Sequence, residues 1–77
     1  IILRVELNEY LLKIGKKVKK IRAERALTQE SFDDLGENSV PVRTLQEIEA
    51  GKSNFTIKTL FNISKKLKVK PKDLLDV

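Results

Sequence analysis

The sequence predicts an all-α domain of five helices. Apolar residues recur at three- and four-residue spacing from about residue 9 onward, as they do on the buried face of a helix. Helix-capping threonines, Thr28 and Thr56, precede two of these segments, and glycine or proline stands between others. The segments follow one another with short connections. They are therefore expected to pack helix on helix around one core.

Residues 1–8 break the helical pattern. Leu3, Val5 and Leu7 alternate with polar residues, a period of two that suits an extended strand. We expect residues 1–8 to be a short extended N-terminal arm, which either packs on the domain or pairs with its counterpart in a second copy as an intersubunit strand. The alternative is that the helix that follows extends toward the N-terminus.

The first helix, over residues 9–25, is amphipathic and has Asn8 as its N-cap. Its apolar stripe comprises Leu11, Ile14, Val18 and Ile21. Lysines occupy the other face, namely Lys13, Lys16, Lys17, Lys19 and Lys20. They form either a solvated surface or a phosphate-facing patch. Gly15, in the middle of this helix, indicates either close packing by another helix or merely that the helix tolerates a glycine there.

A second helix is expected at about residues 28–35, with Thr28 as its N-cap. Phe32 and Leu35 supply its inward face. Residues 36–39 contain glycine, asparagine and serine, which are typical of a turn.

A third helix is expected at about residues 41–50. Pro41 suits its first turn, where a missing N–H is harmless, and Gly51 suits the position just after its end. Thr56 caps a fourth helix, and a fifth covers residues 71–75. The second and third segments together predict a helix-turn-helix, in which the second helix of the pair enters the major groove of DNA.

Composition excludes several classes of function. The 77 residues make one small domain, and they include neither cysteine nor histidine, so disulfides, zinc clusters and imidazole bases are ruled out. Asp33 and Asp34 are adjacent on a predicted helix, where their side chains diverge by about 100° and form no convergent site. We expect no enzyme, no cofactor and no metal site. Without an apolar run of about 20 residues or a signal peptide, the expected protein is cytoplasmic and binds no membrane.

The net charge of +5 favours a polyanionic partner. It is unevenly distributed: residues 1–27 carry eight Lys/Arg against three Asp/Glu, residues 28–51 one against six, and residues 52–77 seven against two. If DNA binds, residues 1–27 and 52–77 must supply most of the phosphate attraction. The acidic side chains between them must point away from the duplex. These are Asp33, Asp34 and Glu37.

Five short motifs occur one after another along the chain. They are Ile14 to Arg22, then Leu27-Thr28-Gln29-Glu30, then Ile48 to Lys52, then Thr59-Leu60 with Ile63 and Leu67, and finally Pro71 to Leu75. On these residues the chain resembles the Cro/phage-repressor type helix-turn-helix family, also called the XRE family. The resemblance implies a compact five-helix, lambda-repressor-like DNA-binding domain over residues 9–77. The sequence departs from the family in a turn about two residues longer and in the apolar Val42 at the start of the recognition helix.

Spacing leaves four side chains of the recognition helix facing outward: Val42, Arg43, Gln46 and Glu47. Arg43 can hold guanine O6 and N7, Gln46 can hold adenine N6 and N7, and Glu47 can accept from cytosine N4. Val42 can contact a thymine methyl. The alternative is that Arg43 and Glu47, one helical turn apart, form an exposed ion pair and contact no base.

Contacts to the DNA backbone are expected from residues on either side of the recognition helix. The candidates are Thr28, Gln29, Thr44, Lys52, Ser53, Asn54 and Lys58. The resemblance further implies that Arg22 and Glu49 form a partly buried structural ion pair. Such a pair orients helices more than it stabilises them.

These features predict a sequence-specific, DNA-binding transcriptional regulator of the repressor or controller type. The resemblance implies a homodimer on an inverted-repeat operator, with residues 67–75 and the arm at residues 1–7 as candidate dimer surfaces. The alternative is an antitoxin-like protein-interaction module that binds a toxin or another protein and for which DNA binding is secondary.

Overall fold

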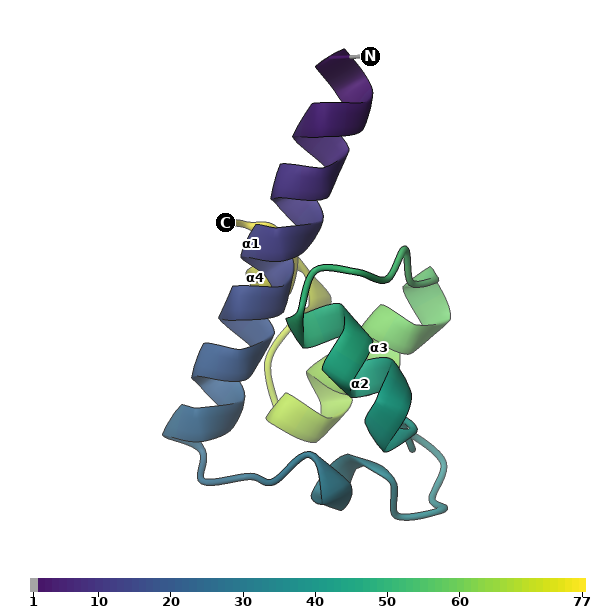
Figure 1. The fold of residues 1–77 in the computed structure, drawn as a ribbon. Coiled ribbons are helices and arrows are strands. Elements are labelled where there is room, and N and C mark those ends of the chain that lie inside the picture. Colours follow the sequence, from purple (N-terminus) through teal and green to yellow (C-terminus); the bar gives the residue numbers. More distant parts are fainter. Residues whose placement is uncertain (1) are drawn as a thin grey trace.

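The computed structural model describes the backbone of residues 2–77 and the side chains of residues 6–77. All its regular elements are helical (Figure 1). They are α1 (Ile2–Glu24), the 3-10 helix η1 (Glu30–Phe32), α2 (Val42–Glu49), α3 (Ile57–Leu67) and α4 (Pro71–Leu75). The all-α prediction is confirmed for the described part of the chain. The expected five α-helices are instead four, because the second segment is only a 3-10 turn.

The extended N-terminal arm is a wrong prediction. Residues 2–8 belong to α1, and only residue 1 of the predicted arm lies outside the described residues. Leucine, arginine and glutamate are good helix formers, and lengthening an existing helix needs no new nucleus. An extended strand would need a partner for its backbone hydrogen bonds, and within the described residues there is no strand to supply one. The alternation of apolar and polar residues gave the wrong prediction of a strand, because Leu3 and Leu7 are also one helical turn apart.

Close packing explains the glycine in the middle of α1. Gly15 is buried, and a Cβ added there would overlap the carbonyl oxygen of Ile48 and lie 2.9 Å from that of Glu49. The backbone of α1 therefore meets the end of α2 with no room for a side chain. Of the two explanations that the sequence allowed for Gly15, the structure supports close packing.

The second segment is the largest departure from the predicted fold. Thr28 does start it, because its Oγ1 accepts a hydrogen bond of 3.2 Å from the backbone N–H of Ser31. The helix does not continue to residue 35, since Asp34 Oδ1 accepts from the N–H of Gly36 at 2.9 Å and Leu35 adopts a φ of +60°. A local side-chain bond of this kind competes with helix formation. Leu35 consequently points outward and is 93% exposed, contrary to its expected inward position.

The predicted boundaries of the later helices are close to the observed ones. Gly51 follows α2 with a φ of +73°, the left-handed conformation that glycine adopts most easily. Thr56 Oγ1 accepts a hydrogen bond of 3.2 Å from the N–H of Thr59 and so caps α3. Pro71 opens α4.

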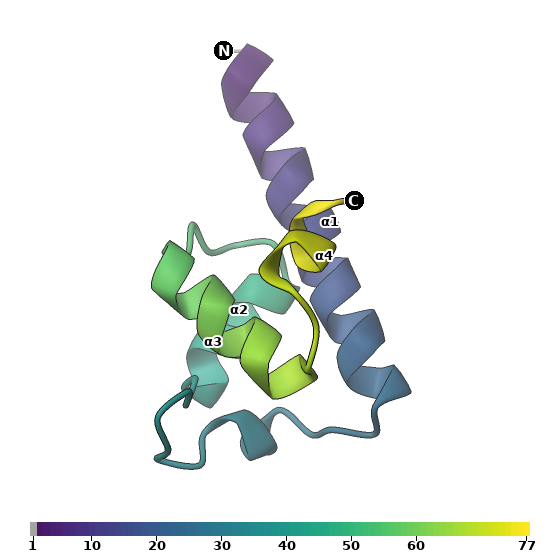
Figure 2. The ribbon, with the colours of Figure 1, turned by 180° about the vertical axis from the view of Figure 1, so that it is seen from behind.

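The core lies where α1, η1, α2, α3 and α4 meet, with α3 on the far side of α2 in Figure 1 and in front of it in Figure 2. Its buried apolar side chains are Ile14, Val18, Ile21, Phe32, Val40, Leu45, Ile48, Leu60, Ile63, Leu67 and Leu74. Val40 closes the long turn, since its N–H donates to the carbonyl of Phe32 at 2.7 Å. The core holds α2 against α1 and leaves the outer side of α2 in solvent.

Candidate functional site

The site consists of α2 and of the segment that runs from Thr28 through η1; Gln29, directly before η1, joins the two by side-chain hydrogen bonds. Arg22 on α1 anchors them: its Nε lies 2.7 Å from Glu49 Oε2 and its Nη2 donates to Glu49 Oε1 at 3.2 Å. Its Nη1 also donates to the carbonyl of Leu27 at 2.9 Å. The Glu49 side chain is 5% exposed and that of Arg22 15%. This ion pair is shielded from solvent and fixes the end of α2 relative to α1 and to the start of the η1 segment.

Two glutamines extend this contact to the surface. Gln29 Nε2 donates to Glu49 Oε1 at 3.1 Å, and Gln46 Nε2 donates to Gln29 Oε1 at 3.2 Å. The result is a chain of hydrogen bonds from Arg22 through Glu49 and Gln29 to Gln46. It uses one N–H of the Gln46 amide, so that the second N–H and the Oε1 atom are available to a ligand. An adenine edge needs one donor and one acceptor of this kind.

Sequence reasoning named all four residues but did not connect Gln29 with Gln46 or with Glu49. Gln29 and Gln46 are 17 positions apart and lie on different elements. No spacing rule pairs such residues, and only the packing of η1 on α2 brings them together.

The remaining outward residues of α2 are arranged as a surface. Arg43 and Glu47 are exposed, whereas Val42 and Thr44 are half-buried. Among the residues whose side chains the structure describes, the ion pairs are Arg22–Glu49 and one between Asp34 and Lys66. Arg43 and Glu47 thus form no ion pair with each other, and the Arg43 guanidinium keeps its hydrogen-bond donors free for a ligand.

Most of the expected backbone-contacting residues lie near the C-terminal end of α2. Thr28 and Gln29 precede η1, and Gln29 bonds to Gln46 and Glu49 in the last turn of α2. Lys52, Ser53, Asn54 and Lys58 follow that same end of α2, in the loop and the first turn of α3 (Figure 1). Lys52, Asn54 and Lys58 are exposed, and Ser53 is half-buried. Polar and cationic groups are therefore gathered around the end of α2 that Glu49 forms.

The lysine-rich face of α1 is separate from the side of α1 on which α2 packs. Lys13, Lys16, Lys17 and Lys20 border a hollow together with Asp76 and Val77. At 100° per residue, these lysines lie about 100–160° around the helix from Gly15, where α2 packs. Lys13, Lys16, Lys17 and Lys20 therefore lie away from the side of α1 that packs on α2. The choice between a solvated surface and a phosphate-facing patch stays a prediction.

The acidic turn is partly neutralised. Asp34 forms an ion pair with Lys66 on α3. The hydrogen bond from the Lys66 ammonium, and after it the one from the N–H of Gly36, hold the pKa of the Asp34 carboxyl below its ordinary value. Asp34 therefore stays charged and paired beside α3.

Comparison with known proteins agrees with this geometry. A sequence profile of the helix-turn-helix family matches residues 18–74, which include α2, α3, η1 and most of α4. Searches of curated proteins and of solved structures gave no match. Among the helices of residues 2–77, none is long and apolar enough to cross a membrane.

Proposed function

Since this chain belongs to the Cro/phage-repressor type (XRE) helix-turn-helix family of DNA-binding regulators, we propose that it is a sequence-specific transcriptional regulator. It acts as a repressor or controller and binds an inverted-repeat operator as a homodimer, with α2 in the major groove. The observation that carries this proposal is the outward face of α2, where Gln46 is held in place from beneath by Gln29 and Arg43 remains unpaired.

Arg43 is the principal base-reading residue in this proposal. Its unpaired guanidinium can donate to guanine O6 and N7 together, a contact that discriminates by about 1–3 kcal/mol. Glu47 and Val42 complete the surface, through a cytosine amine and a thymine methyl respectively. We expect Arg43→Ala to relax the base preference at one position in each half-site while the other positions keep theirs.

Gln46 reads an adjacent base pair with an amide that Gln29 orients. Because Gln29 is itself bonded to Glu49, the orientation is set before DNA arrives, and less side-chain freedom is lost on binding. Replacing Gln29 by alanine should therefore weaken the base preference at the Gln46 position, although the Gln46 side chain is unchanged.

The flanking residues anchor the phosphates. They are Thr28 and Gln29, of which Gln29 bonds to the last turn of α2, then Lys52, Ser53, Asn54 and Lys58, which follow that end of α2, and Thr44 in the first half of α2. These contacts position the protein without reading sequence. Each lysine that neutralises a phosphate contributes about 0.9 to the slope of log affinity against log salt concentration.

A random-oligonucleotide binding selection at two salt concentrations tests the proposal. We expect one inverted-repeat sequence to be enriched and Lys52→Ala to weaken all sequences similarly while lowering the salt slope by about one per half-site. Lys20→Ala is the matched control, because it removes the same charge on the face of α1 away from α2. If no sequence is enriched at either salt concentration, sequence-specific regulation is excluded.

An antitoxin-like interaction module is the second candidate, and one observation favours it. Ile57 and Phe61 lie one turn apart on α3 and are 76% and 45% exposed, so two large apolar side chains face solvent. Co-purification with the small protein of a neighbouring gene, lost on Ile57→Ser with Phe61→Ser, would support this function. DNA enrichment unaffected by the same double substitution would support the regulator.

A further inference from the structure

A hollow beside α1, away from the side on which α2 packs, is lined mainly by lysines. Its lining consists of Lys13, Lys16, Lys17, Lys20, Asp76 and Val77, and its volume is about 340 Å³. α1 forms one wall, and the C-terminal residues, which run beside α1 in Figure 2, form the other. The surface proposed for DNA uses none of these residues.

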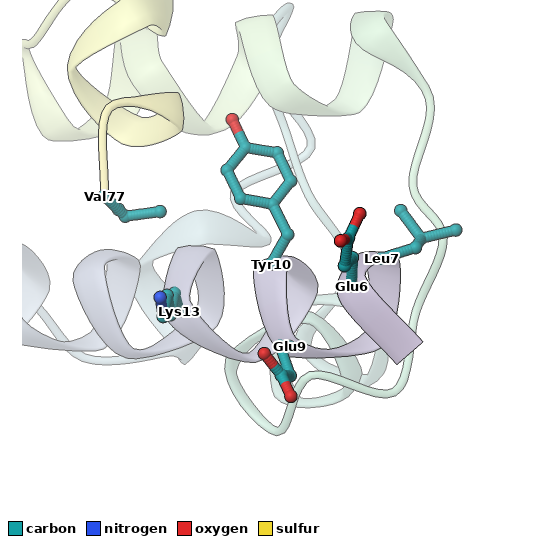
Figure 3. Close-up of a pocket in the computed structure, with 6 residues that line it drawn as sticks. All are labelled: Glu6, Leu7, Glu9, Tyr10, Lys13 and Val77. Carbon is teal, nitrogen blue, oxygen red and sulfur yellow. The ribbon is translucent and has the colours of Figure 1, made fainter. Parts of the chain in front are cut away.

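Hydrogen bonds hold the C-terminal wall of this lysine hollow in place. The Tyr10 hydroxyl of α1 donates to the carbonyl of Leu75 at 2.6 Å, and Figure 3 shows the Tyr10 ring directed toward α4. The N–H of Asp76 donates to the carbonyl of Lys72 at 3.0 Å, and the N–H of Val77 donates to that of Leu75 at 3.1 Å. Asp76 and Val77 therefore have fixed positions, and the hollow is formed before any ligand arrives.

The four lysines of the hollow repel one another. Among residues 6–77, whose side chains the structure describes, no ion pair includes any of them. Lys13 and Lys17 are one helical turn apart. Lys16 and Lys20 have the same spacing, and like charges at this spacing destabilise a helix. With four cations against the single carboxylate of Asp76, the hollow is positive, and an anionic ligand would replace repulsion by attraction.

The other two residues of the hollow indicate which kind of anion fits. Asp76 places a carboxylate among the lysines, and Val77 places an apolar side chain beside them. The methylene stems of the lysines add further apolar surface. A phosphate backbone offers no cation or N–H to Asp76 and no apolar side chain to Val77. A protein segment can offer both of these as well as carboxylates for the lysines, so it complements the whole hollow.

We propose that the lysine hollow binds an acidic amphipathic helix of a second protein. Carboxylates at positions i, i+3, i+4 and i+7 of such a helix share one face and repeat the spacing of the four lysines. This pattern is the same in both directions, so either orientation of the partner helix pairs every lysine. An apolar side chain on the same face packs on Val77 and on the lysine stems. Because the hollow is separate from the surface proposed for DNA, the chain can hold this partner and a duplex together.

Two synthetic helical peptides serve as probes. The matched peptide carries glutamates at positions i, i+3, i+4 and i+7 and a leucine on the same face, whereas the scrambled peptide has the same composition with its glutamates spread around the helix. We would measure their dissociation constants with the full chain by fluorescence anisotropy. The matched peptide should bind about tenfold or more tightly than the scrambled one at low salt, and its affinity should fall as salt is added.

Two double variants separate the lysine hollow from the surface proposed for DNA. Lys16→Glu with Lys20→Glu should raise the dissociation constant of the matched peptide about tenfold or more, because two attractions become repulsions, and should leave the DNA enrichment unchanged. Lys52→Glu with Lys58→Glu makes the same charge change outside the hollow. It should weaken DNA binding and leave the peptide constant within about threefold. Circular dichroism checks that each variant keeps its helix content.

Three outcomes would overturn this proposal: a matched peptide that does not bind, equal binding of the two peptides, or a peptide constant that Lys16→Glu with Lys20→Glu leaves unchanged. A duplex without an inverted repeat provides a fourth. If it binds the wild-type chain and loses its affinity in the Lys16→Glu, Lys20→Glu variant, the hollow takes phosphates and not a protein helix. None of these outcomes affects the test of sequence-specific regulation, which depends on α2 and on the lysines that follow it.

Discussion

Replacing Gly15 by alanine should destabilise the protein, although alanine is the better helix former. In an exposed helix interior this substitution would gain about 1 kcal/mol. Here the new Cβ would overlap the carbonyl oxygen of Ile48 and approach that of Glu49 to 2.9 Å. Both neighbours are backbone atoms of α2 and cannot rotate away as a side chain could.

The expected loss follows from these opposing effects. Added volume in a packed core costs about 1–3 kcal/mol, and the upper part of that range applies because the backbone of α2 must move. After the gain in helix propensity is subtracted, the free energy of unfolding should fall by about 1–2 kcal/mol. For a domain of this size that corresponds to a decrease in Tm of about 4–16 °C.

Thermal and urea unfolding followed by far-ultraviolet circular dichroism would measure this change. Gly36→Ala is the matched control: Gly36 lies in the exposed turn, and its added Cβ would meet only the side chain of Asp34, at 3.0 Å. Its Tm should stay near that of the wild type. A Gly15→Ala variant as stable as the wild type would refute the close approach of α1 and α2.

Two further predictions concern charged groups. Arg22→Ala should lower the free energy of unfolding by about 2–4 kcal/mol, because Glu49 would remain shielded and unpaired; urea unfolding measures this, and an Arg22→Ala, Glu49→Leu double variant should recover part of the loss. An NMR titration should find the pKa of Asp34 below the usual value of about 3.9 and returned toward it by Lys66→Ala. Because the folded-state pKa is the lower one, this pair stabilises the fold above the ordinary pKa, and its contribution disappears as pH falls through the folded-state value. An unshifted Asp34 would contradict the pairing with Lys66.

Local chemistry explains the elements that were predicted well. Thr56 caps α3, Gly51 follows α2 in a left-handed conformation, and Pro71 opens α4. Each depends on one residue and its nearest neighbours in the chain, and therefore on preferences that are visible in the sequence. The helix-turn-helix family was identifiable from the same kind of signal, because its short motifs occur in a set order.

The mistaken elements depended on competition between local preferences. Residues 2–8 satisfied both an alternating and a helical pattern, and the adjoining helix decided between them by making extension easy. In the second segment, the Asp34 side chain offered the backbone of Gly36 another partner, and the helix stopped after one 3-10 turn.

By itself, the sequence determined an all-α helix-turn-helix chain, the caps that bound its later helices and the exposure of Arg43, Gln46 and Glu47 on α2. Only the tertiary structure decided that Gln29 bonds to Glu49 and Gln46, that Lys13, Lys16, Lys17 and Lys20 lie away from α2, and that Tyr10 lies beside Leu75. The physical reason is the separation along the chain over which each kind of interaction acts. Caps and periodicity act over a few residues of chain, whereas these contacts join positions 17 to 65 residues apart and exist only once the core has set how the helices cross.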